Sequence, residues 1–157
     1  MRHSLRVGFS FGLVSGIITT LGLIVGLHSS THSRIFIIGG ILVIAIADAL
    51  SDAMGIHISE EAENKHSAAE IWESTISTFL SKFIFALSFL VPVLLFDLNT
   101  AIIVCIIWGM LLIVIFSVHL ARSQQKRVAH IVVEHFVLAI VVIILTHYVG
   151  DWVATFG

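Results

Sequence analysis

Residues 35–59 read IFIIGGILVIAIADALSDAMGIHIS, an apolar run that two aspartates interrupt. A helix needs about 20 apolar residues to cross the hydrocarbon of a bilayer, so the length of this run predicts a transmembrane helix. Asp48 and Asp52 lie four residues apart inside it, and a charged side chain at mid-membrane costs about 2.5–3.5 kcal/mol on insertion scales. We therefore expect a bound cation, a shared proton or a water-filled path to offset the cost of these carboxylates.

The rest of the chain has the same apolar character. Of its 157 residues, 58% are hydrophobic and 11% are charged, and the mean hydropathy is +1.09. This composition excludes an ordinary water-soluble domain. Apolar segments of spanning length cover residues 5–27, 35–59, 76–96, 101–120 and 128–149. The fold prediction is a single all-α domain over residues 1–157, a polytopic membrane protein with five transmembrane helices and a short acidic turn and helix start at 60–75.

Lysine and arginine predict the orientation. With five spans, Arg34 is the one such residue on the side of the second span's start, and the opposite side collects Arg2, Arg6, Lys65, Lys82, Arg122, Lys126 and Arg127. The positive-inside rule then predicts a cytoplasmic N-terminus in a cell membrane or a vacuole-like organelle membrane. Lys82 follows the start of the third apolar segment by about two turns, and we expect it to snorkel to the interface.

Four local signals predict helix ends or kinks. Ser67-Ala68-Ala69-Glu70 is a capping box, so the third helix is expected to begin near Ser67, before its apolar part. Residues 97–100 contain good capping residues and predict a tight turn. Pro92 is expected to kink or terminate the third span, and Gly150 is expected to end the last helix.

The first span carries small residues on one helical face. They follow steps of four and three residues, which bring side chains to the same side of a helix. Small residues allow helices to approach closely in lipid, either within one chain or at a subunit interface that lines a path. Both interpretations remain open for this set: Gly8, Gly12, Ser15, Thr19, Gly22 and Gly26.

The aspartates of the second span lie on one face with small residues, namely Ala45, Gly55 and Ser59. Beyond this face, toward the predicted cytoplasmic side, acids gather around one turn. They form either a solvated acidic face at a helix start or a patch that collects cations. These acids are Glu60, Glu63, Glu70 and Glu73. Near the start of the fifth span, His130 and Glu134 are four residues apart and are candidate additional site residues.

The chemistry of these residues favours ion binding over catalysis. The sequence contains no nucleophile elbow, P-loop or dinucleotide motif in a suitable context, so we expect no enzyme, and nothing in it indicates nucleic-acid binding. An aspartate pair in lipid fits either a divalent cation such as Mg²⁺, Mn²⁺ or Fe²⁺, or a proton relay. One helix offers few ligands, whereas a two-fold dimer would bring four aspartates together. A purely structural pair, satisfied by neighbouring hydroxyls, is the alternative.

Several blocks of the chain resemble the vacuolar iron transporter family, whose members move Fe²⁺ or Mn²⁺ across membranes. Residues 12–27 (GLVSGIITTLGLIVGL) are similar to the family's first span, and residues 49–63, which contain ALSDAMG, to its second. Residues 85–96 (FALSFLVPVLLF) resemble the third span, and residues 148–150 its end. The chain departs from the family at Ser15, where an aspartate is usual, at Asp52, where methionine is usual, and at Ile56, where glutamate is usual. The family's glutamate-rich cytoplasmic domain between the second and third spans is missing.

The resemblance implies a homodimeric transporter that exports Fe²⁺ or Mn²⁺ from the cytoplasm, in exchange for protons, with no permanent cofactor. Asp48 and Asp52 are then the expected intramembrane ligands or proton sites. Ser15 and Thr19 would face them from the first span, and Gly55 and Ser59 would line the same pathway. The alternative function is a non-transporting membrane scaffold or sensor whose aspartates bind a structural ion or a subunit partner.

Overall fold

The computed structural model describes residues 3–156, and this part of the chain is entirely helical apart from short turns. Five stretches are long and apolar enough to span a membrane, with α3 and α4 forming one of them. The structure therefore confirms the five-span, all-α fold, and Arg2 lies outside the described residues. The helices are α1 (His3–Thr31), α2 (Arg34–Glu63), α3 (Ala68–Ser88), α4 (Leu90–Leu95), α5 (Leu98–Ser123) and α6 (Val128–Ala154).

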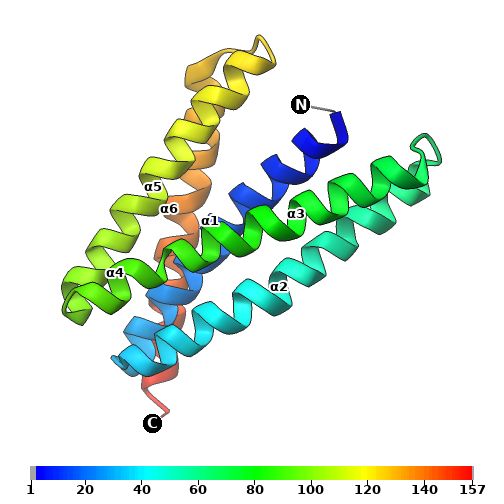
Figure 1. The fold of residues 1–157 in the computed structure, drawn as a ribbon. Coiled ribbons are helices and arrows are strands. Elements are labelled where there is room, and N and C mark those ends of the chain that lie inside the picture. The colour runs from blue at the N-terminus through cyan, green and yellow to red at the C-terminus, as the bar shows by residue number, and fades with distance from the viewer. Residues whose placement is uncertain (1–2, 157) are drawn as a thin grey trace.

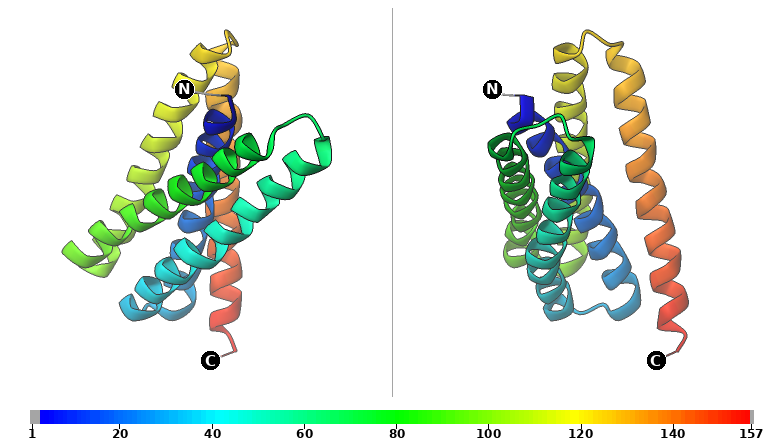
Figure 2. Two further views of the ribbon diagram at one scale, coloured as in Figure 1. Left: turned by 45° about the vertical axis from the view of Figure 1, so that its right-hand side comes forward. Right: turned by 90° about the vertical axis from the view of Figure 1, so that its right-hand side faces the viewer.

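Helix α1 is the centre of the bundle. It packs against α2, α3, α5 and α6, and Figures 1 and 2 show it between a hairpin of α2 and α3 and a hairpin of α5 and α6. The start of α1 and the turns at 64–67 and 124–127 lie at one end of the bundle, here called the N-terminal end. The turns at 32–33 and 96–97 and the end of α6 lie at the opposite, C-terminal end. This is the arrangement that five spans require, and the cytoplasmic position of the N-terminal end stays a prediction.

The small residues of α1 allow close contact with neighbouring helices of the same chain. A Cβ added to Gly8 would collide with the carbonyl of Ser74, and one added to Gly12 with the carbonyl of Thr78, both on α3. Farther along, a Cβ at Gly22 would lie 3.2 Å from a methyl carbon of Thr146 on α6. The glycines of this face therefore serve packing within the chain, the first of the two interpretations.

Two predicted caps are present. The Ser67 backbone N–H donates to the Glu70 carboxylate (2.9 Å), and the Glu70 N–H donates to Ser67 Oγ (3.4 Å), which completes the capping box at the start of α3. At α5, the Thr100 N–H donates to Asp97 Oδ2 (3.0 Å). The hydrogen bonds from Thr100 hold the pKa of the Asp97 carboxyl below its ordinary value. The cap therefore stabilises the folded state at neutral pH, and this stabilisation is lost as pH falls through the lowered pKa.

Replacing Ser67 by alanine is expected to lower the free energy of unfolding by about 1 kcal/mol, the usual cost of losing an N-cap. Thermal unfolding in detergent would measure the loss, and amide exchange should increase at Glu70, whose N–H loses its acceptor. Ser51→Ala, on the exposed face of α2, is the control and should not reduce stability. A Ser67→Ala protein with unchanged unfolding and exchange would contradict a stabilising role for the box.

Pro92 interrupts the third span, whereas Gly150 lies inside the last helix. Helix α3 ends at Ser88 and α4 begins at Leu90, because the ring of a proline clashes with the carbonyl four residues earlier, here that of Ser88. The kink prediction is therefore confirmed. The prediction that Gly150 ends the last helix is wrong, since α6 continues to Ala154. Gly150 is buried against α1, where a Cβ would lie 2.7 Å from Cβ of Ser29, so this glycine serves helix packing.

The interior of the bundle differs between its two halves. Toward the C-terminal end it is an apolar core that includes Ile17, Leu21, Ile37 and Phe89. Toward the N-terminal end the buried side chains of α3 are mostly polar, and one of them is Lys82. The charged residues of the second span lie where these halves meet.

Candidate ion site

Lys82 is the unexpected member of the site. Its side chain is 1% exposed, and its Nζ lies 2.5 Å from Asp48 Oδ2 and 2.5 Å from Asp52 Oδ2. The prediction that Lys82 snorkels to the interface is therefore wrong. Because α3 begins at Ala68, Lys82 lies about 20 Å along the helix from its first residue, at 1.5 Å per residue. No lysine side chain reaches that far, and a buried ammonium requires anionic partners.

Ser15 completes the cluster from α1. Its hydroxyl donates to Asp52 Oδ2 (2.6 Å) and accepts from Lys82 Nζ (3.0 Å). Thr19 is one turn farther along α1, and its hydroxyl donates to the Ser15 backbone carbonyl (2.8 Å). The structure thus places Ser15 against Asp52, whereas Thr19 donates its hydroxyl proton to the backbone of its own helix. We call these four residues the charge cluster: Ser15, Asp48, Asp52 and Lys82.

The charge cluster lies deep in the bundle but is not sealed from its surface. Asp52 is about 16 Å from the last residue of α2 at 1.5 Å per residue, which is near mid-membrane for a spanning helix. The side chains of Asp48 and Asp52 are 30% and 21% exposed, in contrast to Lys82. Asp48 Oδ2 is buried and makes no hydrogen bond, so its contact with the ammonium is an ion pair alone. The cluster carries two negative charges and one positive charge when all three groups are ionised.

A buried row of hydroxyls on α3 connects the N-terminal end of the bundle to the charge cluster. Thr75 and Thr78 donate to carbonyls of their own helix, and so does Ser81, so each oxygen keeps lone pairs that can accept. Ser74 donates to the Glu60 carboxylate (2.5 Å) at the end of the row that lies nearer the N-terminal end of the bundle. The sequence predicted no site residues here, although the spacing of Ser74, Thr75, Thr78, Ser81 and Lys82 already indicates one polar helix face.

The four acids proposed to collect cations have separate environments. Glu60 is buried against Ser74, and His57 lies nearby on α2 with Nδ1 3.0 Å from Thr75 Oγ1. Glu73 accepts from Ser4 of α1 (3.0 Å). Glu70 belongs to the capping box, and Glu63 lies 3.7 Å from His66 at the exposed turn. Only Glu60 of this set therefore lies at the start of the buried polar row.

The remaining candidates do not join the charge cluster. Gly55 and Ser59 are exposed on α2, and a Cβ at Gly55 would meet no atom within 4 Å. They could line a pathway only if a second molecule covered this face. His130 and Glu134 are exposed on α6, which packs mainly on α1 and α5, so the structure does not bring them to the aspartates.

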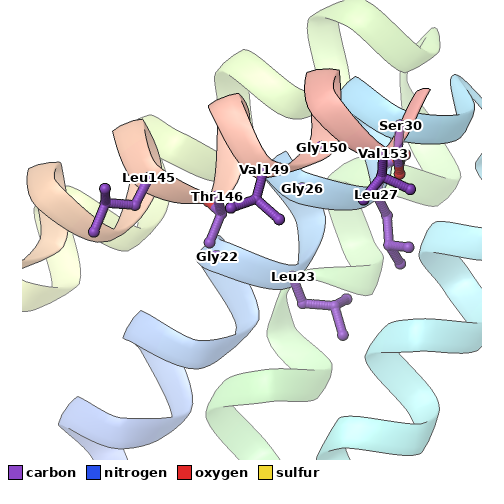
Figure 3. Close-up of a pocket in the computed structure, with 10 residues that line it drawn as sticks. All are labelled: Gly22, Leu23, Gly26, Leu27, Ser30, Leu145, Thr146, Val149, Gly150 and Val153. Carbon is purple, nitrogen blue, oxygen red and sulfur yellow. Dashed lines mark hydrogen bonds between the residues drawn. The ribbon is translucent and has the colours of Figure 1, made fainter. Parts of the chain in front are cut away.

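No complete metal site is found elsewhere in the part of the chain that the structure describes. Within residues 3–156, no three side chains of the histidine, cysteine, aspartate and glutamate types are placed to hold a metal ion. A groove of about 480 Å³ lies between α1 and α6 near the C-terminal end (Figure 3). Its lining includes Leu23, Leu27 and Val149 and no ionisable side chain, so it does not fit a cation. Asp48 and Asp52 with Ser15 are an oxygen-ligand set that lies inside the bundle.

The fold and the cluster define an integral membrane protein with ionisable side chains between α1, α2 and α3. A search of protein-family models, of characterised proteins and of solved structures finds no significant match to this chain.

Proposed function

We propose that the protein is a membrane transporter of a divalent transition metal, Fe²⁺ or Mn²⁺, and that Asp48 and Asp52 bind the ion. The observation that carries the proposal is a pair of carboxylates at mid-membrane, 21–30% exposed, at the inner end of a buried polar row. Intramembrane acids of this kind mark ion pathways and proton relays. Carboxylate and hydroxyl oxygens are ligands that suit Mn²⁺ and Fe²⁺.

The charge of the cluster favours a homodimer as the transporting unit. Each protomer contributes two carboxylates and one ammonium, a net charge of about −1 when all are ionised. Two protomers would neutralise one divalent cation, and a two-fold axis beside α2 would place both clusters on one path. The partly exposed carboxylates also need a polar cover, because lipid tails cannot solvate them. Export from the cytoplasm in exchange for protons is the direction that the resemblance to the vacuolar iron transporter family implies.

A second candidate function is favoured by Lys82. Its ammonium contacts both carboxylates, and this is what a purely structural ion pair would look like in a membrane scaffold or sensor. A buried pair is weak evidence for stability, since its desolvation cost can exceed the attraction. Transport activity separates the two functions.

Purified protein in proteoliposomes is expected to carry Mn²⁺ or Fe²⁺, measured with a trapped metal-sensitive dye. The neutral variant Asp48→Asn/Asp52→Asn/Lys82→Met removes the ligands without leaving an unpaired charge, and its flux is expected to fall to that of protein-free liposomes. Asp151→Asn, at the exposed end of α6, is the matched control and should retain flux. Full flux in the folded neutral variant would contradict the proposed site.

Two other results would redirect the proposal. A wild-type protein without metal flux, whose aspartates affect only folding or assembly, would favour the scaffold. Flux that requires a pH gradient and no metal would indicate another solute, with the aspartates serving protons alone.

A further inference from the structure

The ammonium of Lys82 occupies the place of a cation. A lysine ammonium has three N–H donors, and Nζ has three oxygen neighbours, Asp48 Oδ2 and Asp52 Oδ2 at 2.5 Å and Ser15 Oγ at 3.0 Å. These oxygens are also the ligands that the proposed function assigns to the metal. A metal ion bound through these oxygens would therefore compete with the ammonium for them.

Helix α1 packs closely against the backbone of Lys82, and a glycine on α1 accommodates the lysine stem. A Cβ at Gly12 would be 3.1 Å from the Lys82 backbone nitrogen, and one at Gly16 would be 3.0 Å from its carbonyl oxygen, so α1 holds this part of α3 closely. The same position at Gly16 is 3.1 Å from Lys82 Cγ, which means that the glycine makes space for the lysine stem. A lysine stem has four rotatable carbons and ends in a point charge, unlike the planar fork of arginine.

Acceptors for a displaced ammonium lie on the same helix. Thr78 and Ser81 precede Lys82 by four residues and one residue, are buried, and donate their hydroxyl protons to backbone carbonyls. Each of these oxygens keeps lone pairs that can accept a hydrogen bond. On the carboxylate side, Asp48 Oδ2 is buried and receives no hydrogen bond, so the ammonium satisfies this oxygen only through its charge.

We propose that Lys82 is a tethered cation that fills the ion site when no metal is bound, and that the transported ion enters by displacing its ammonium from Asp48 and Asp52. This inference rests on the proposed function. It adds that the competing ammonium of Lys82 determines the affinity of the site for the metal ion. The empty carrier then never exposes two uncompensated carboxylates at mid-membrane. Because the metal ion must displace the ammonium, it binds more weakly than it would bind to the two carboxylates alone. The weaker binding favours release of the metal ion.

The test is Mn²⁺ binding to the whole protein in nanodiscs, followed by electron paramagnetic resonance of the free ion. Lys82→Met removes the ammonium and keeps the length of the stem, and we expect Mn²⁺ affinity to rise by about tenfold or more, since a competing charge in direct contact is lost. Lys65→Met removes an equal charge at the exposed turn and should leave the affinity within about twofold, as expected for a screened surface charge. An unchanged or weaker affinity in Lys82→Met would overturn the inference.

A second pair of variants covers the case in which Lys82→Met does not fold. Asp48→Asn keeps one carboxylate beside the ammonium, and Asp48→Asn/Lys82→Met keeps the same carboxylate without it. The double variant is expected to bind Mn²⁺ more tightly than the single variant, and equal affinities would overturn the inference. Wild-type flux with no gain in either comparison contradicts only the role of Lys82, whereas the absence of Mn²⁺ binding and flux in every variant contradicts the proposed function itself.

Discussion

Replacing Asp48 and Asp52 together by asparagine is expected to lower the free energy of unfolding by about 3–5 kcal/mol, the usual cost of leaving one member of a buried ion pair alone. The cause is Lys82, whose side chain is 1% exposed and whose nearest anions are these two carboxylates. Asparagine keeps the shape of aspartate, so little of the loss would come from packing. Thermal or chemical unfolding in detergent measures the effect.

Adding Lys82→Met to this double variant is expected to recover most of the lost stability. Replacing a buried ion pair by apolar or neutral groups of similar size is often neutral or stabilising. A neutral variant as unstable as the double variant would show that hydrogen bonding, for example from Ser15 to residue 52, matters more than charge. The comparison also has a practical consequence, because a flux defect in the double variant alone would not distinguish a lost ligand from a lost fold.

The parts of the fold that were predictable depend on local sequence. Hydropathy identifies the five spans because each helix satisfies its own backbone hydrogen bonds in lipid, whatever its neighbours do. The cap at Ser67 was equally predictable, since Ser67 and Glu70 satisfy each other within one turn. The alignment of Asp48 and Asp52 on one face follows from helix periodicity alone.

The partner of the aspartates was not predicted because it depends on helix packing. Lys82 looked interfacial when its depth was counted from the apolar segment at 76, but α3 begins at Ala68. Its approach to α2 requires α1 to let α3 come close at Gly12 and Gly16, a contact between residues far apart in the chain. The prediction that Gly150 ends the last helix failed for a related reason. A glycine that ends a helix and a glycine that allows close approach of a neighbouring helix look the same in the local sequence.

The polar face of α3 could have been recognised. Hydroxyls at positions 74, 75, 78 and 81 lead to Lys82 with helical spacing. A lysine that continues such a face has a lower free energy inside a bundle than in lipid. Serine and threonine alone do not indicate a buried polar face in an apolar helix, because their hydroxyls can donate to the backbone of their own helix, as those of Thr75 and Thr78 do here. The lysine was the informative residue of the set.

Gly12→Ala is expected to destabilise the protein by about 1–3 kcal/mol, the usual cost of overpacking a close contact. A Cβ at this position would collide with Ser81 Oγ and with the Thr78 carbonyl oxygen, and a backbone atom cannot move aside without shifting α3. Because Lys82 follows Ser81 directly, the shift should also move the ammonium relative to the aspartates and change Mn²⁺ affinity. Thermal unfolding and Mn²⁺ binding measure the two effects.

Gly39→Ala is the matched control, since a Cβ there would meet nothing within 4 Å. Alanine is the better helix former by about 0.8–1.0 kcal/mol, so this variant should be as stable as the wild type or more so. If Gly12→Ala were equally stable and impaired only dimer formation, the glycine face of α1 would belong to a subunit interface rather than to packing within the chain.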